Sequence, residues 1–250
     1  MRRPTRDASH IHIAHPDKRT NAAGRLIQNE ILLAIPDADF IRIQPHLEFL
    51  GLPRRLVLHE ANRKLRYVYF PNRGLISLVV ETANGKTVEV GVVGKEGVTG
   101  MASVAALNRS PLREVVQIEG DGFRVPVSPL RQALKVASQL QMLMSRFAVL
   151  QGLQISQTAA CNRLHEVTQR LARWLLMVHD RVNSSSLPLT HDFVATMLGT
   201  DRPSVTLAAG ALQRKGAIQN TRGAIKISDR EKLESAACEC YEVIRQLGRD

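Results

Sequence analysis

Glycine is unevenly distributed along the chain, and this distribution most constrains the fold. Between Gly51 and Gly122 it recurs nine times, and the intervening runs are short and rich in β-branched and aromatic residues. After Pro129 it becomes rare and helical spacing takes over. Short runs between glycines are typical of strands joined by turns, whereas long periodic stretches indicate helices. The sequence therefore predicts a β module followed by a helical module.

The β module is predicted to be a barrel or sandwich of short strands. The strands are expected at Arg55–His59, Leu65–Phe70, Leu75–Glu81, Thr87–Val93, Val115–Glu119 and Phe123–Val127. Asn84-Gly85 favours a hairpin between two of them, because both residues tolerate a positive φ. Two short helices, at about 25–35 and 37–47, are expected before the strands.

Residues 1–24 are predicted to be a flexible basic tail, since they show no helical or strand periodicity. The tail contains His10, His12 and His15, which raises the alternative of a metal-binding patch. Because no cysteine or carboxylate ligand accompanies them in a folded frame, a solvated tail is favoured.

A long helix is expected after Pro129, with a narrow row of residues at alternating three- and four-residue spacing. The row comprises Leu140, Leu143, Phe147, Leu150, Gln154 and Cys161. A narrow row is typical of a helix that pairs with another helix, so we predict that this row is the seam of a homodimer. The alternative is a helix packed on its own β module, which usually has a wider apolar face.

The stretch Leu187–Asp229 predicts a helix-turn-helix followed by a hairpin. Thr190 is a plausible N-cap of a short helix that ends at Gly199. Pro203 fits the first turn of the next helix, and Gly216 fits its end. The order of short helix, turn and second helix indicates a helix-turn-helix, and two short strands after it would form a wing.

The second helix, at about 202–215, is predicted to recognise DNA. Arg202 can donate two hydrogen bonds to a guanine edge, and Leu207 could contact a thymine methyl group. The full set of predicted DNA-contacting residues is Thr190, Arg202, Pro203, Ser204, Thr206, Leu207, Lys215, Arg222 and Lys226. No acidic residue occurs from Pro203 through Ser228, which favours DNA over the alternative of a winged helix that docks a protein partner.

Net charge and cysteine content limit the classes of partner and compartment. The chain carries 34 Lys and Arg against 23 Asp and Glu, a net charge of +11, which favours an anionic partner such as nucleic acid or an acidic membrane surface. No apolar run reaches the length of a membrane span, and no signal peptide is expected, because Pro4 to Asp7 are not apolar. Three cysteines are too few for a disulfide framework, so a reducing cytoplasm is expected.

The segment Leu-Thr-x-x-x-x-Ala-x-x-Leu-Gly-x-x-Arg-x-Ser-Val, from Leu189 to Val205, resembles the cyclic-AMP receptor/FNR (Crp/Fnr) family of bacterial transcription regulators. The resemblance covers about residues 25–235. It implies an α+β fold with a cyclic-nucleotide-binding-like β-roll at 25–128, a helical region with a dimerisation helix at 129–163, a winged helix-turn-helix at 164–235 and a C-terminal tail at 236–250. It also implies a homodimer that binds double-stranded DNA at inverted repeats, with RNA polymerase as a further partner.

Departures from the family pattern bear on cofactors. Family members that bind cyclic AMP carry a Gly-Glu-Leu segment followed by Arg-Ser-Ala, whereas this chain has Gly100-Met101-Ala102 and no Arg-Ser pair near Arg113. Without the Glu, the ribose hydroxyl has no partner, so cyclic AMP binding is not expected. Gly100, Met101 and Arg113 remain candidates for contacts to an unidentified anionic or apolar effector. An iron–sulfur cluster of the FNR kind is excluded, because no cysteine precedes Cys161.

Two cysteine-containing segments remain, and for Cys161 and His165 a structural packing role is favoured over catalysis. Cys161 and His165 are one helical turn apart and could form an activated thiolate, but no third orienting group accompanies them in sequence. Cys238-Glu239-Cys240 lacks a second pair, so no zinc site is expected. No catalytic set of side chains is apparent, so an enzyme is not expected.

Overall fold

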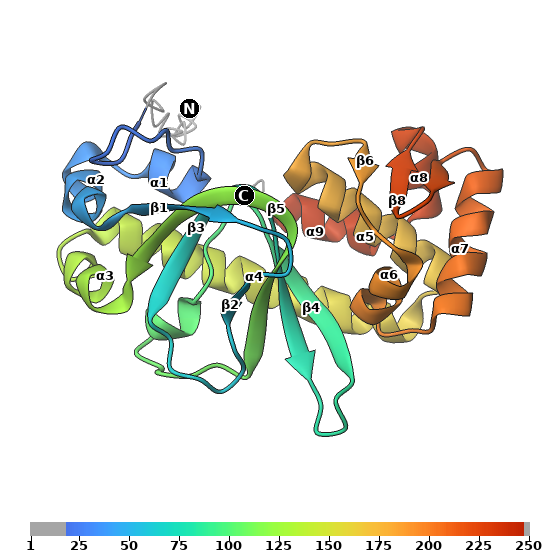
Figure 1. Cartoon of the computed structure of the whole chain (residues 1–250), viewed down its shortest axis with the longest axis horizontal. Helices are drawn as coiled ribbons and strands as arrows, with labels where there is room; N and C mark the ends of the chain where they lie inside the picture. The colour runs from blue at the N-terminus through green and yellow to red at the C-terminus, as the bar shows by residue number, and fades with distance from the viewer. Residues whose placement is uncertain (1–18, 248–250) are drawn as a thin grey trace, which may run out of the picture.

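The computed structural model describes residues 19–247, which form a β module and a helical module joined by the long helix α4 (Ser138–Leu164). In Figure 1 the β module and the helical module lie at opposite ends of the longest axis, and α4 passes behind both. The mixed fold class, with an N-terminal antiparallel sheet and a C-terminal helix-turn-helix, is confirmed. Among the described helices, none combines the length and apolarity that crossing a bilayer would require.

The β module contains an antiparallel sheet in the order β1-β5-β3-β4, with β2 paired to β5. Its strands are β1 (Glu48–Leu52), β2 (Val57–His59), β3 (Tyr67–Glu81), β4 (Thr87–Val93) and β5 (Leu112–Pro126). Short helices cover one end of the sheet: α1 (Glu30–Ala34), α2 (Asp37–Ile43), the 3₁₀ turns Gln44–His46 and Met101–Ser103, and α3 (Val127–Leu134).

β3 and β5 are long bent strands, whereas the sequence predicted two shorter strands in place of each. The pairing of β3 with β5 shifts register around Arg73 and continues on both sides of it. Gly74 has φ +89°, and a Cβ atom there would lie 2.6 Å from the carbonyl oxygen of Ile118. Glycine therefore permits a bulge that bends the strand without ending it. β1 was not predicted.

Both predicted tails are shorter than expected. Arg19 is buried and donates hydrogen bonds to the carbonyl oxygens of Leu32 (2.7 Å) and Ile35 (2.9 Å), so the ordered chain begins before residue 25. Residues 1–18, with the three tail histidines, lie outside the described residues. At the other end, α8 (Arg230–Ala236) is followed by α9 (Cys240–Leu247), whose Tyr241 and Ile244 join the core of the helical module. The prediction of a tail at 236–250 is therefore wrong for α9. The apolar face of this helix is only two turns long, which is too short to show helical periodicity in the sequence.

The row predicted to be the dimer seam lies inside the chain. Leu140 packs in the core of the β module, with Leu143 and Phe147 against it, and Gln154 and Cys161 are buried further along α4. Leu150 is partly buried. Leu140, Gln154 and Cys161 are therefore covered by the chain's own elements and are not available to a second copy, whereas Leu143, Phe147 and Leu150 are only partly covered. The alternative of a helix packed on its own β module describes this face of α4.

The helical module is built around α5 (Val167–Val182). Against it pack α6 (His191–Leu198), α7 (Arg202–Arg214) and a three-stranded sheet in the order β6-β8-β7, formed by Ser186–Leu187, Ala224–Ile227 and Ile218–Thr221. The apolar core of this module includes Leu75, Val92 and Ile118 of the β module. The two modules therefore share one core and hold each other in a defined orientation.

A buried polar contact reinforces the junction between the modules. The carboxylate of Glu89 on β4 accepts hydrogen bonds from Trp174 Nε1 (2.7 Å) on α5 and from the hydroxyl of Ser77 on β3. Burial raises the pKa of Glu89 to about 7, although the hydrogen bonds from Ser77 and Trp174 and the charges of Arg173 and Arg181 oppose this shift. The folded protein thus holds a proton on Glu89 where an exposed carboxylate has lost it.

We expect the stability of the protein to fall as pH rises from about 4.5 to about 7, because the unfolded chain ionises Glu89 over this range and the folded chain does not. The full effect of this one group is at most about 3 kcal/mol. Glu89→Gln removes the ionisation and keeps an acceptor for Trp174, so its denaturant midpoint should depend less on pH. Glu81→Gln, at an exposed end of β3, is the control. An equal pH dependence in wild type and Glu89→Gln would contradict the assignment.

Candidate nucleic-acid interface

The two helices of the helix-turn-helix are set by capping residues at the turn between them. The hydroxyl of Thr190 accepts a hydrogen bond from the Phe193 amide (3.3 Å) at the start of α6. α6 ends at Gly199, whose φ of +61° favours glycine. Asp201 then caps α7, because its carboxylate accepts hydrogen bonds from the amide (2.8 Å) and the hydroxyl (2.9 Å) of Ser204. These bonds lower the pKa of Asp201, so it remains ionised at the positive end of the helix dipole.

α7 presents one face to the core and the opposite face to solvent. Its inner face consists of Val205, Ala208, Ala209 and Leu212, all buried. On the outer face, Leu207 has 75% of its surface exposed, and Arg202, Pro203 and Thr206 are also exposed. Pro203 lies in the first turn, where its missing N–H group leaves no hydrogen bond unmade. An exposed leucine beside polar groups at this position is compatible with contact to bases, such as a thymine methyl group.

The wing is the hairpin of β7 and β8, and it lies beside the C-terminal end of α7. Its turn contains Arg222 and Gly223, which has φ +80°. Gln213 of α7 accepts hydrogen bonds from the amide (2.8 Å) and from the side chain (3.0 Å) of Asn220. The wing is thereby fixed to α7. The side chains of Lys215, Arg222 and Lys226 are exposed around it.

His191 was not predicted to take part in this site. Its Nδ1 atom lies 3.1 Å from the hydroxyl of Thr206 on α7, and its Nε2 atom lies 3.3 Å from Oδ1 of Asn220 on the wing. The imidazole therefore connects α6, α7 and the wing. In sequence, His191 follows the N-cap residue and resembles any polar residue in a first turn, so no local signal distinguished it.

The predicted DNA-contacting residues gather at one end of the molecule. Three of them also make contacts within the protein. The hydroxyl of Thr190 is engaged in capping, and that of Thr206 donates to the carbonyl oxygen of Arg202 (3.0 Å). Arg202 itself lies 3.4 Å from the carboxylate of Asp192, with both side chains exposed. Such an exposed pair is weak and can exchange for a stronger anionic partner.

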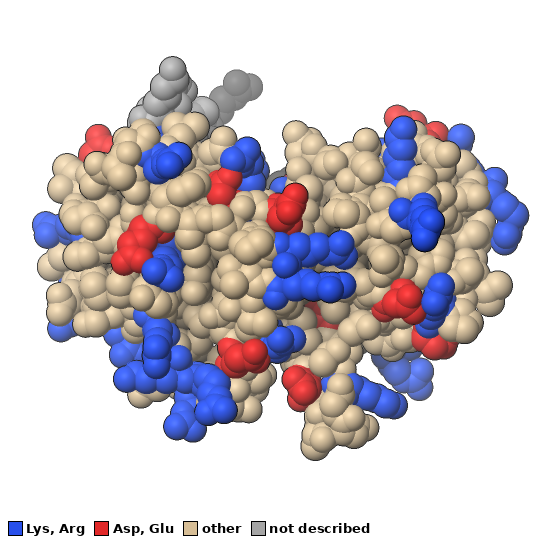
Figure 2. Space-filling view, in the orientation of Figure 1, with Lys and Arg blue, Asp and Glu red and all other residues tan. Residues whose placement is uncertain are grey.

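Positive charge is concentrated in two places. Figure 2 shows Lys and Arg side chains around the outer edge of the helical module, where α7 lies, and another group at the lower edge of the β module. In the β module, Arg63, Lys64 and Arg66 line an open cavity together with Arg109. The net charge of +11 therefore does not belong to the helix-turn-helix alone.

The residues proposed to contact an effector do not form a binding site for an anion. A Cβ atom on Gly100 would lie 2.9 Å from His59 Cε1, so His59 fills the space in front of this glycine. The carboxylate of Glu114 accepts a hydrogen bond from the Gly100 amide (3.1 Å) and contacts His59 Nδ1 (2.6 Å). Arg113 instead pairs with Glu60 at 3.0 Å. A buried carboxylate thus occupies the position where an anionic effector would need a donor.

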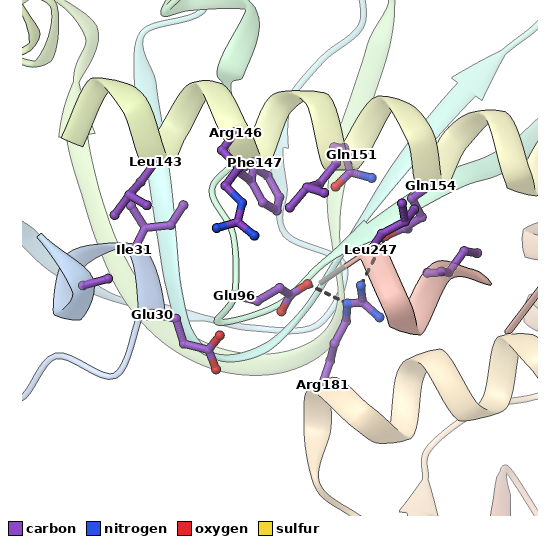
Figure 3. A pocket seen from close by; sticks show the side chains of 13 residues that line it. Glu30, Ile31, Glu96, Leu143, Arg146, Phe147, Gln151, Gln154, Arg181 and Leu247 are labelled. Atoms are coloured by element: carbon purple, nitrogen blue, oxygen red, sulfur yellow. Dashed lines mark hydrogen bonds and ion pairs between the residues drawn. The ribbon is translucent and has the colours of Figure 1, made fainter. Parts of the chain in front are cut away.

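A different cavity, of about 280 Å³, lies where α1, α4, α5 and α9 meet (Figure 3). Leu143, Phe147 and Leu150 form its apolar side, and the pair of Arg181 and Glu96 (2.6 Å) lies at its edge. Arg181 comes from the helical module and Glu96 from the turn after β4, so this cavity contacts both modules. None of Gly100, Met101 and Arg113 lines it.

Comparisons with known proteins agree with this architecture. Residues 169–236 match the family model of the Crp-like helix-turn-helix domain. No curated protein sequence matches the chain. Among solved structures, the chain is similar to FixK2 from Bradyrhizobium japonicum (15% identity, TM-score 0.66, covering 77% of this chain and 98% of that chain). It is also similar to CLP, the c-di-GMP responsive global regulator of Xanthomonas campestris (14%, 0.64, 77% and 99%), and to TTHA1359, a CRP/FNR-family transcriptional regulator from Thermus thermophilus (20%, 0.61, 76% and 98%). The resemblance to Crp/Fnr regulators is confirmed at the level of the fold and of the helix-turn-helix.

Proposed function

We propose that this chain, which has the fold of Crp/Fnr regulators and a Crp-like helix-turn-helix domain, is a homodimeric transcription regulator that binds inverted repeats in double-stranded DNA. The observation that carries the proposal is the outer face of α7, where exposed Leu207 stands among Arg202, Pro203 and Thr206. A capped helix with this face enters a major groove, and the basic side chains at its C-terminal end and on the wing neutralise phosphates.

A second copy is proposed to pair along the solvent-exposed side of α4, which we call the outer row. Its members alternate at three- and four-residue spacing: Met142, Ser145, Val149, Gly152, Ser156 and Ala159. Three- and four-residue spacing keeps a row on one side of a helix that pairs with another. The small residues in the row allow two helices to approach closely, and Val149 and Met142 supply apolar contacts. Pairing here would hold two recognition helices about 34 Å apart, the distance between successive major grooves.

Cyclic AMP is not proposed as an effector. The Glu114 carboxylate and the His59 ring occupy the space in front of Gly100, and the Arg113 guanidinium is paired with Glu60 at the surface. The cavity between α1, α4, α5 and α9 is a more suitable place for an effector, because a ligand there would contact both modules and the inner side of the proposed dimer helix. A small molecule with an apolar part fits the lining formed by Phe147 and Leu150.

Selection of bound sequences from a random duplex pool tests the proposal, since it should return inverted repeats. In fluorescence anisotropy on a selected duplex, Lys215→Ala and Arg222→Ala should each weaken binding to all sequences similarly. Each should also lower the slope of log affinity against log salt by about 0.9, because each removes one phosphate contact. Lys86→Ala, in the exposed hairpin of the β module, is the control and should leave the slope unchanged.

The rival function is a small-molecule sensor whose winged helix docks a protein. It predicts weak duplex binding without sequence preference and almost no contribution of Lys215 and Arg222 to the salt slope. A selection that enriches no motif would favour this rival over DNA regulation.

A further inference from the structure

All three cysteines of the chain and one histidine meet at a single buried point. Cys161 and His165 come from the C-terminal end of α4, and Cys238 and Cys240 come from the connection between α8 and α9. Their three sulfur atoms and one ring nitrogen all lie within 4.8 Å of one another. The Sγ atoms of Cys161 and Cys238 are 3.4 Å apart, and Cys240 Sγ lies 3.6 Å from His165 Nδ1. The three thiols are buried.

We propose that this cluster binds one zinc ion through three thiolates and the Nδ1 atom of His165. Zinc favours four tetrahedral ligands, with Zn–S distances of about 2.3 Å and Zn–N distances of about 2.0 Å. The edges of such a tetrahedron are about 3.8 Å between sulfurs and about 3.6 Å between sulfur and nitrogen. The Cys161–Cys238 sulfur distance (3.4 Å) and the distance from Cys240 Sγ to His165 Nδ1 (3.6 Å) lie close to these edges, and the other pairs lie within 4.8 Å, so small rotations of the side chains would complete the coordination shell. Four protein ligands close the site, which is typical of structural zinc.

The groups around the cluster orient the ligands for a metal. His165 Nε2 lies 3.1 Å from Oε1 of Glu239. With the ring proton on Nε2, the imidazole donates a hydrogen bond to this carboxylate, and the lone pair of Nδ1 is free to bind the metal. Gln157 donates a hydrogen bond from Nε2 to Cys240 Sγ (3.0 Å), which suits a thiolate. The turn that brings His165 beside Cys161 is fixed by the His165 amide, which donates to the Cys161 carbonyl oxygen (3.1 Å).

The charge of the surroundings also suits a zinc site of this composition. Three thiolates and one Zn²⁺ carry a net charge of −1. Arg170 and Arg173 of α5, with 8% and 2% of their surfaces exposed, lie within electrostatic reach of the thiols. The Nε atoms of both guanidiniums are buried without a hydrogen-bond partner among the described residues. A nearby anionic centre offsets the cost of burying these two cations.

Two other occupants of the cluster fit less well. A disulfide between Cys161 and Cys238 would need the sulfurs at about 2.05 Å, and it would leave Cys240 and His165 without a role. The four ligands of an iron–sulfur cluster are divided between at least two iron atoms, so ligands on different irons are more widely separated than the ligands of a single ion. The compactness of this cluster favours one ion.

A zinc ion bound here would link the segment between α8 and α9 to the turn between α4 and α5. At that turn the proposed dimer helix α4 ends and the helical module begins, so the metal would set the orientation of the helical module relative to α4. This consequence rests on the proposed function, whereas the metal site itself does not.

The test uses the full-length protein purified under reducing conditions without chelator. We expect one zinc per chain by elemental analysis and, after exchange with Co²⁺, the thiolate-to-cobalt absorption together with the visible bands of a tetrahedral ion. Iron with acid-labile sulfide, a Cys161–Cys238 disulfide in the isolated protein, or a Co²⁺ spectrum without thiolate bands would overturn the proposal. Neither readout depends on DNA, so a failed DNA selection and a failed metal site remain distinguishable.

Variants separate the site from other metal ligands. Cys238→Ser and Cys240→Ser should each lose the thiolate spectrum of the wild type. Glu239→Gln should still fold, since the side chain is exposed, and should bind zinc roughly 10- to 100-fold more weakly in competition with a chromogenic chelator. His46→Asn is the matched histidine control, and replacing His10, His12 and His15 with alanine excludes zinc held by the N-terminal segment. Equal zinc affinity in Glu239→Gln and wild type would contradict the assigned orientation of His165, and zinc lost with the three N-terminal histidines would contradict the site.

Discussion

Leu207→Glu is expected to abolish sequence-specific DNA binding while leaving the fold intact. The side chain is 75% exposed on the outer face of α7 and does not belong to the apolar core of the helical module. In a complex, the new carboxylate would replace an apolar contact and face the phosphates, and like charges across an interface cost several kcal/mol. We expect the affinity for the selected duplex to fall by at least about 100-fold, or about 3 kcal/mol, measured by fluorescence anisotropy.

The control for this variant is Leu107→Glu. Leu107 is also an exposed leucine, at 58%, but lies in the β module after the 3₁₀ turn Met101–Ser103. Leu107→Glu adds the same charge to the molecule as Leu207→Glu does, so a general electrostatic effect on DNA binding would appear in both variants. Both should unfold at the wild-type temperature. Wild-type affinity in Leu207→Glu would show that α7 does not enter the groove.

The helix-turn-helix was predicted closely because its signals are local. Thr190, Gly199, Pro203 and Gly216 each mark a helix end through backbone preferences that act within one turn. The structure places α6 at His191–Leu198 and α7 at Arg202–Arg214, as those residues indicated. The link made by His191 to α7 and the wing could not be predicted, because it joins residues that only the tertiary fold brings together.

The cysteine cluster shows the same limit more clearly. The sequence presents Cys161 with His165 and, separately, Cys238 with Cys240, and each pair alone is too small for a metal site. Their meeting depends on α9, a helix of eight residues that packs on α4 and α5. Its two turns are too short to show helical periodicity, so the sequence predicts only a tail for the segment that contains Cys238 and Cys240.

In the long helix α4, one spacing pattern is compatible with two different packing partners. Three- and four-residue spacing occurs on two of its sides, since Leu140, Leu143 and Phe147 follow it as well as the outer row. The length and narrowness of the first row are what predicted a dimer seam there. In the structure the larger side chains fill the core of the β module, and the side with small residues is left facing solvent. The most apolar side of α4 therefore packs within its own chain.

Val149→Glu is expected to convert the protein to a monomer. Val149 is 63% exposed at the centre of the outer row. Because a two-fold axis repeats each residue in the partner, one substitution brings two carboxylates into the proposed interface. A monomer contacts only one half-site, and loss of the linked second contact should lower the affinity for an inverted repeat by roughly 10²- to 10⁴-fold. Sedimentation equilibrium and anisotropy measure the two effects on the same preparation. Ile41→Glu, at 63% exposure on α2, is the matched control and should remain dimeric with wild-type affinity. A dimeric Val149→Glu that still binds the inverted repeat would rule out the outer row as the interface.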